Sequence, residues 1–154
     1  MATQAKATVL HVEDDPNDRL FVERAFKKCG VAVQIRAVSC GEDAVSYLTA
    51  QGGFADRARY PEPVFVLLDL KLTGMSGFEM LEWARKQRTD ARLLPIAILT
   101  SSREGTDVRR AYEAGATTYF VKPSDTEDLH PLIHALADYW FVYAKLPPAQ
   151  PEAS

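Results

Sequence analysis

Five short apolar runs, each separated from the next by a longer stretch with helical periodicity, constrain the fold of this chain most strongly. Strands and helices that alternate in this way predict a doubly wound α/β fold, a parallel sheet with helices on both faces. The chain has 154 residues, which suits one domain with one core. The predicted strands are residues 9–12, 31–38, 64–68, 96–99 and 119–121.

The spacing of apolar residues differs among these runs. Residues 64–68 and 96–99 are apolar at successive positions, as expected of central strands that are covered on both faces. Residues 31–38 alternate, with Gln34 and Arg36 at polar positions. This alternation predicts an edge strand with one wetter face.

The stretches between the runs carry helix-end signals. Asp15 followed by Pro16 predicts the N-cap and first turn of a helix that Gly30 ends. The other predicted helices are residues 41–50, 78–88, 104–113 and 125–145, the last with Asp125 as its N-cap.

Two segments have compositions typical of irregular structure. Residues 51–63 contain two glycines and two prolines, which predicts a surface loop. Residues 147–154 are rich in proline and alanine and are predicted to form a flexible C-terminal tail. The sequence therefore predicts one domain at residues 1–146, followed by this tail.

Charge and hydropathy exclude several classes of protein. The formal net charge of −3 favours neither nucleic acid nor an anionic membrane as a partner. No stretch is apolar for long enough to span a bilayer, and the first six residues lack the apolar core of a signal peptide. We therefore expect a cytoplasmic protein. Cys29 and Cys40 lack the spacing of a zinc site or a redox motif.

Polar side chains follow four of the predicted strands. The first strand runs into an acidic run at residues 13–15, the third into Asp69, the fourth into Thr100 and the fifth into Lys122. Because the carboxyl ends of parallel strands meet at one edge of a sheet, we expect these groups to converge. Repulsion among the carboxylates favours a divalent cation, and Mg²⁺ suits such an oxygen-rich site. A carboxylate there can act as a nucleophile toward phosphorus.

Together these residues resemble the receiver domain of two-component response regulators, over residues 7–146. This resemblance implies a flavodoxin-like and CheY-like (βα)5 fold with strand order 2-1-3-4-5. It also implies a signalling switch that catalyses only its own phosphorylation and dephosphorylation, and therefore no enzyme. The matching motifs are VLHVEDD (9–15), LLDLKL (67–72), GMSG (74–77), LPI (94–96), LTS (99–101), AGA (114–116) and VKP (121–123).

The resemblance implies that Asp69 is the phosphoacceptor. It also implies a Mg²⁺ cofactor held by Glu13, Asp14, Asp69 and the backbone carbonyl of Lys71. The acidic run allows a second register, in which Asp14 and Asp15 form the metal-binding pair. The family register and the predicted capping role of Asp15 both favour Glu13 and Asp14.

Thr100 and Lys122 are implied to complete the catalytic set, and Thr100 and Tyr119 to form the switch. The implied phosphoryl donor is the phosphohistidine of a sensor histidine kinase. Phosphorylation is then expected to draw the Thr100 hydroxyl inward, so that Tyr119 rotates into the vacated space. The surface of the fourth helix, fifth strand and fifth helix would change in response.

The last predicted helix carries more apolar surface than one face can bury. Residues 139–143 are apolar at five successive positions, which cover all sides of a helix. Leftover apolar surface is typical of an interface, so we predict a symmetric homodimer through the fourth helix, fifth strand and fifth helix. Alternatively, residues 147–148 fold back over these rings. Residues 139–147 and 51–63 also resemble small regulators paired with bacterial phytochrome kinases, which implies such a kinase as partner.

Two other functions fit parts of the pattern. A haloacid-dehalogenase-like phosphatase also uses a nucleophilic Asp and Mg²⁺, but on its first strand and with a second Asp two positions on, where this chain has Lys71. A receiver-like adaptor that takes no phosphate needs none of the chemical positions that are present here. Neither a DNA-binding helix-turn-helix nor an output enzyme follows in the sequence, so we expect output from the receiver surface itself.

Overall fold

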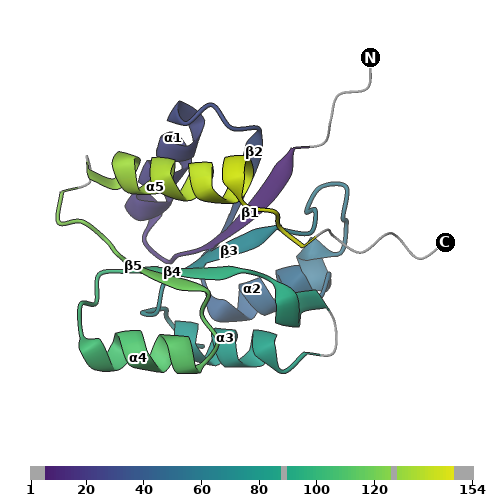
Figure 1. Ribbon diagram of the computed structural model, residues 1–154. Coiled ribbons are helices and arrows are strands. Elements are labelled where there is room, and N and C mark those ends of the chain that lie inside the picture. Colours follow the sequence, from purple (N-terminus) through teal and green to yellow (C-terminus); the bar gives the residue numbers. More distant parts are fainter. Residues whose placement is uncertain (1–5, 88–89, 126–127, 148–154) are drawn as a thin grey trace, which may run out of the picture.

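The computed structural model describes residues 6–87, 90–125 and 128–147 (Figure 1). One parallel sheet of five strands lies at its centre, in the order β2-β1-β3-β4-β5. The predicted α/β class and strand order are confirmed, and the alternating strand β2 lies at an edge. The strands are β1 (Ala7–Val12), β2 (Val33–Val38), β3 (Phe65–Leu68), β4 (Ile96–Thr100) and β5 (Thr118–Val121).

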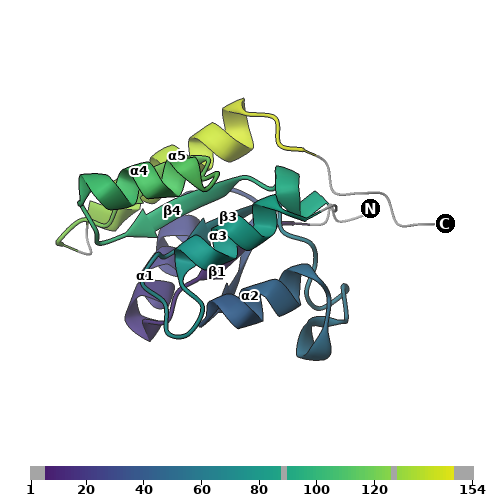
Figure 2. The same cartoon turned by 90° about the horizontal axis from the view of Figure 1, so that it is seen from below.

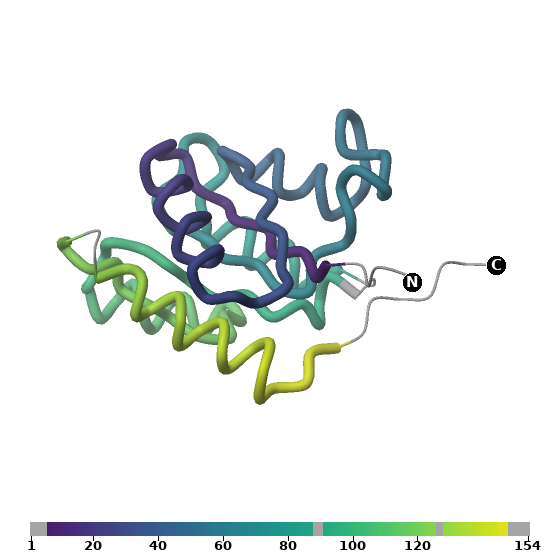
Figure 3. Tube along the Cα trace, turned by 90° about the horizontal axis from the view of Figure 1, so that it is seen from above, coloured from purple at the N-terminus to yellow at the C-terminus, as the bar shows by residue number. Residues whose placement is uncertain are grey.

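Helices cover both faces of this sheet. Helices α1 (Pro16–Lys28) and α5 (Leu129–Ala137) cover one face and lie side by side (Figures 1 and 3). Helices α2 (Gly41–Leu48), α3 (Gly77–Arg85) and α4 (Gly105–Glu113) cover the other, with α3 in the middle (Figure 2).

Each face has its own apolar core because side chains alternate along a strand. Val9 of β1 faces the α1 and α5 layer, whereas its neighbour Leu10 faces the α2, α3 and α4 layer. Both side chains are fully buried. Strands β3 and β4 are buried along their whole length, as their continuous apolar runs predict.

The predicted start of α1 is confirmed in detail. The Asp15 carboxylate accepts hydrogen bonds from the backbone N–H groups of Asn17 at 2.8 Å and Asp18 at 3.4 Å. Pro16 then occupies the first turn. Gly30 follows the helix with φ of +71°, a conformation that favours glycine.

The last helix differs from the prediction at both ends. Helix α5 begins at Leu129, later than the predicted start after Asp125. Residues 126–127 lie outside the described residues, so capping by Asp125 stays a prediction. From Asp138–Tyr143 the chain continues as a π-helix, labelled η4. A π-helix has more residues per turn than an α-helix, which lets two successive rings, Trp140 and Phe141, both pack on Phe65. Of the predicted tail, residues 148–154 lie outside the described residues.

The loop predicted at residues 51–63 is irregular but tightly anchored. It contains a short 3₁₀ helix, η1 (Gly52–Phe54), and its rings Phe54 and Tyr60 contact Tyr47 of α2. The Arg57 guanidinium donates to the backbone oxygen of Tyr47 at 2.8 Å. The guanidinium thus satisfies a carbonyl at the C-terminus of α2, where helices leave such groups unpaired.

Within the described part of the chain, no helix combines the length and the apolar character that crossing a membrane would need.

Gly77, the first residue of α3, permits a close approach between that helix and the end of β3. A Cβ atom at this position would overlap the backbone oxygen of Asp69. We expect Gly77→Ala to lower the free energy of unfolding by about 1–3 kcal/mol through this overlap. Urea denaturation followed by circular dichroism measures the loss.

Gly105 is the matched control, because it is the first residue of α4 and a Cβ there meets no atom within 4 Å. Gly105→Ala should leave stability unchanged or raise it by up to about 1 kcal/mol. Equal stability of the two alanine variants would contradict the proposed close approach.

Candidate functional site

The register of the sheet brings the ends of β1 and β3 together. Val12 pairs with Leu68, and the backbone N–H of Asp69 donates to the Val12 oxygen at 3.1 Å. Glu13 and Asp69 are each the first residue after their strand, so they lie next to each other at this edge of the sheet. Their strand ends face the left side of the view in Figure 1.

Lys122 directly follows β5 and lies at the same edge of the sheet. Val121 pairs with Thr100 at the end of β4, and the Lys122 N–H donates to the Thr100 oxygen at 2.7 Å. The lysine side chain then extends across β4 toward the acidic ends of β1 and β3. The predicted convergence of strand-end groups is therefore present in the structure.

The Lys122 ammonium lies among three carboxylates. Its Nζ is 2.5 Å from Glu13 Oε1, 2.9 Å from Asp18 Oδ2 and 3.0 Å from Asp69 Oδ2. Only 16% of the lysine side chain and 1% of the Glu13 side chain are exposed. Buried charges require partners of opposite sign, and here one ammonium faces three carboxyl groups.

The oxygen atoms of Glu13, Asp14 and Asp69 suit a divalent cation. One carboxylate oxygen from each lies within 4.8 Å of the others. Glu13 Oε2 is buried and has no hydrogen-bond partner among the described residues, so it is free to act as a ligand. This cluster contains Asp14 but not Asp15, whose Oδ1 accepts hydrogen bonds at the start of α1.

The pKa values of Glu13 and Asp69, the two buried carboxyl groups of the cluster, shift in opposite directions. Burial, then hydrogen bonding with Asp69 and Asp18, raises the pKa of Glu13 to about 9. Burial acts to raise the pKa of Asp69 too, but hydrogen bonding with Glu13 and the Lys122 charge outweigh it and lower that pKa. Asp69 is therefore ionised at neutral pH and has the charge that a nucleophile needs.

Lys122 keeps its own charge. Burial acts to lower the pKa of this lysine, but hydrogen bonds to Glu13 and Asp18 outweigh burial and raise it.

The pKa of His11, on the buried strand β1, is lowered to about 4 by burial and by the Lys122 charge. The imidazole is neutral at neutral pH, as expected of a packed side chain.

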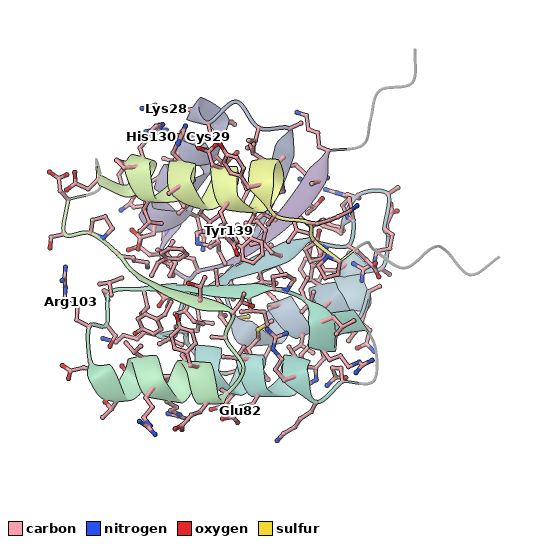
Figure 4. The ribbon with its side chains drawn as sticks, in the orientation of Figure 1. Lys28, Cys29, Glu82, Arg103, His130 and Tyr139 are labelled. Atoms are coloured by element: carbon pink, nitrogen blue, oxygen red, sulfur yellow. The ribbon has the colours of Figure 1, made fainter. Side chains whose placement is uncertain are left out.

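Thr100 and Tyr119 lie next to this cluster in the fold. Thr100 is fully buried, and its hydroxyl oxygen has no hydrogen-bond partner within the described residues. The Tyr119 hydroxyl donates to the backbone oxygen of Ser102 at 2.9 Å, and the Ser102 hydroxyl donates to Asp107 at 2.6 Å. Arg103, labelled in Figure 4, follows in the same loop between β4 and α4.

Three residues of the site were missed by the sequence analysis. Asp18 contacts Lys122, the Thr73 hydroxyl donates to Asp14 Oδ2 at 3.4 Å, and Gly77 packs on the backbone of Asp69. Acidic residues are common in the first turn of helices because of the helix dipole, so Asp18 gave no distinct signal. The backbone N–H of Lys71 also donates to Asp69 Oδ1, at 3.2 Å.

An open parallel sheet with acidic groups and a lysine at its carboxyl edge defines a class of α/β proteins that bind ligands at the strand ends. Comparison with known proteins identifies the family. The sequence profile described as "Response regulator receiver domain" matches residues 9–134. The chain belongs to this family of signalling proteins, whose typical function is a phosphorylation-dependent switch.

Individual relatives agree with this assignment. The probable methanogenesis regulatory protein FilR2 of Methanothrix harundinacea is 31% identical, over 90% of this chain and 86% of the relative. Response regulator Rcp1 of Synechocystis sp. is 29% identical, over 92% of this chain and 93% of the relative.

Solved structures extend the similarity to a bacteriophytochrome response regulator, RtBRR, with a TM-score of 0.72 at 34% identity over 94% of this chain and 86% of that one. Response regulator RPA3017, described in red light signalling of R. palustris, has a TM-score of 0.86 at 31% identity, and the match covers 93% of this chain and 99% of that one. The Mn²⁺-bound form of Rcp1 has a TM-score of 0.83 at 27% identity, with 92% and 99% coverage. That a relative binds Mn²⁺ is compatible with the acidic cluster found here.

Adding a divalent cation should stabilise the protein, because it would relieve the repulsion among Glu13, Asp14 and Asp69. At a hundredfold excess over its dissociation constant, a cation that binds only the folded state adds about 2.7 kcal/mol to the free energy of unfolding. Thermal unfolding with MgCl₂, and then with added EDTA, measures this effect.

Asp14→Asn should remove most of that stabilisation. Glu62→Gln is the control, since Glu62 is exposed and precedes β3 at the opposite edge of the sheet. A thermal midpoint that rises equally in both variants would place the cation elsewhere.

Proposed function

We propose that this chain is a phosphoacceptor switch in a two-component phosphorelay, with Asp69 as the residue that accepts the phosphoryl group from a histidine kinase. The observation that carries the proposal is the ionised Asp69 carboxylate beside the Lys122 ammonium, 3.0 Å apart, next to the acidic pair Glu13 and Asp14. This arrangement combines a nucleophile with groups that neutralise phosphoryl oxygens.

The proposed step transfers one phosphoryl group. An oxygen of Asp69 attacks the phosphorus of phosphohistidine, a P–O bond forms, the P–N bond breaks, and the imidazole nitrogen keeps the electron pair. Lys122 donates an N–H to one phosphoryl oxygen, and the Thr100 hydroxyl or a backbone N–H donates to another. The product on Asp69 is an acyl phosphate.

We propose Mg²⁺ as the cofactor, held by Glu13, Asp14, Asp69 and the backbone carbonyl of Lys71. A bound Mg²⁺ supplies charge neutralisation for the carboxylates and the phosphoryl oxygens. Two observations support this ligand set: Glu13 Oε2 has no hydrogen-bond partner among the residues that the structure describes, and the three carboxylates are closely spaced.

The switch would pass through Thr100 and Tyr119. The Thr100 hydroxyl is buried and has no partner in the described part of the chain, so new acceptor oxygens on Asp69 would give it one. The ring of Tyr119 would then leave Ser102 and turn into the space behind Thr100, which changes the surface of α4, β5 and α5. The rotation would break the hydrogen bond, 2.9 Å long, that the Tyr119 hydroxyl donates to the Ser102 oxygen.

The similarity to the bacteriophytochrome response regulator RtBRR supports a phytochrome-type histidine kinase as the partner. A cytoplasmic location is proposed with it. We propose no catalytic activity beyond the protein's own phosphorylation and dephosphorylation, and no nucleic-acid or membrane partner. We also propose that the receiver domain extends to residue 146, since Leu146 packs on the core beneath α1 and α5.

Incubation with acetyl phosphate and Mg²⁺ tests the function directly. We expect the intact mass to rise by one phosphoryl group, because the Asp69 carboxylate is ionised and faces Lys122. Asp69→Asn should abolish the gain, whereas Asp43→Asn, on α2, should retain it. Absence of any gain in the wild-type chain would favour a phosphorylation-independent adaptor.

The aromatic surface of the last helix supports a homodimer through α4, β5 and α5. Trp140 and Phe141 pack on Phe65, but Tyr139 is 60% exposed and Tyr143 is 82% exposed. Figure 4 labels Tyr139 at the C-terminal part of this helix, on the side where β4 and β5 lie. Tyr112 of α4 adds a further exposed ring to the proposed surface.

Combining Tyr139→Ser with Tyr143→Ser should weaken the dimer by at least about tenfold, since aromatic side chains dominate interface energetics. Sedimentation velocity at several concentrations measures the change. The control is Leu93→Ser, because Leu93 is also a large, exposed hydrophobic residue but lies in η2 (Asp90–Leu93), before β4. A wild-type monomer, with and without an acyl-phosphate analogue, would rule the dimer out.

A further inference from the structure

Asp18 reaches the phosphoacceptor site from a helix, whereas the other charged groups come from strand ends. It lies in the first turn of α1, and its Oδ2 is 2.9 Å from Lys122 Nζ. The N-cap fixes this turn, because the backbone N–H of Asp18 donates to the Asp15 carboxylate. The local structure of α1 therefore holds Asp18 beside Lys122.

The three N–H donors of the Lys122 ammonium are matched by three acceptors. Glu13, Asp18 and Asp69 each accept one hydrogen bond. A lysine side chain is long and flexible, so an ammonium held by one carboxylate alone would sample many positions. With Glu13 and Asp18 as two anchors, the remaining N–H is directed at Asp69.

We propose that Asp18 is a positioning residue for phosphoryl transfer, and this role rests on the proposed function of Asp69. When an Asp69 oxygen bonds to phosphorus, that oxygen loses its charge and becomes a weaker acceptor. The N–H that faces Asp69 then turns to a phosphoryl oxygen. Glu13 and Asp18 keep the other two N–H groups, so the ammonium stays in place throughout the transfer.

A purely stabilising ion pair accounts for Asp18 less well. Its side chain is 30% exposed, and ion pairs with that much solvent contribute little to stability. Its negative charge also adds to a site that already holds three carboxylates and must receive an anionic phosphoryl group. The geometry therefore favours a role in orienting Lys122 over a role in charge balance.

Two variants separate orientation from charge. Asp18→Ala removes the anchor, and Asp18→Asn keeps an acceptor oxygen but removes the charge. At saturating Mg²⁺, we expect Asp18→Ala to slow phosphorylation by acetyl phosphate about fivefold and Asp18→Asn to stay within about twofold of wild type. Glu23→Ala is the control, since Glu23 lies on the same helix and forms its ion pair with Lys27 at the surface.

A double-mutant cycle tests whether Asp18 acts through Lys122. In a Lys122→Ala background, followed over longer times, Asp18→Ala should cause no further loss of rate. A wild-type rate in Asp18→Ala, a faster rate, or an equal loss in the Lys122→Ala background would each overturn the positioning role. No transfer to the wild-type chain would instead overturn the function of Asp69 itself, and the role of Asp18 with it.

Discussion

The ammonium of Lys122 is the group on which the geometry of the site depends. It joins the ends of β1, β3 and β5 and the first turn of α1 through hydrogen bonds to Glu13, Asp18 and Asp69. Because a buried charge without a partner costs several kcal/mol, this lysine and its acidic neighbours constrain one another. In the observed strand order β5 lies beside β4, and Lys122 extends from there toward the acidic ends of β1 and β3.

Stability and chemistry are located in different parts of the molecule. The two apolar cores lie on the two faces of the sheet. The charged cluster lies at the carboxyl edge, just beyond the ends of the buried strands. Gly77 connects the two, because it lets α3 start against the backbone of Asp69. The buried Thr100 hydroxyl, without a partner among the described residues, lies at the same boundary.

Most of the fold and of the candidate site could be predicted because the relevant signals are local. Apolar runs marked all five strands, and Asp15 with Pro16 marked the start of α1. Helix α5 starts at Leu129, later than predicted, because an Asp before a helical stretch marks a cap but does not fix where the α-helical hydrogen bonds begin. The π-helix was not predicted, because the apolar periodicity that marks a helix repeats every 3.6 residues and a π-helix departs from that repeat.

The sequence by itself determined which chemical groups stand at the strand ends, because a polar residue after an apolar run is a local pattern. Only the tertiary structure decided how these groups act on one another. It added Asp18 to the partners of Lys122, raised the pKa of Glu13, and brought Trp140 and Phe141 together on Phe65. Each of these depends on contacts between distant parts of the chain and on the exclusion of water, which no local pattern records.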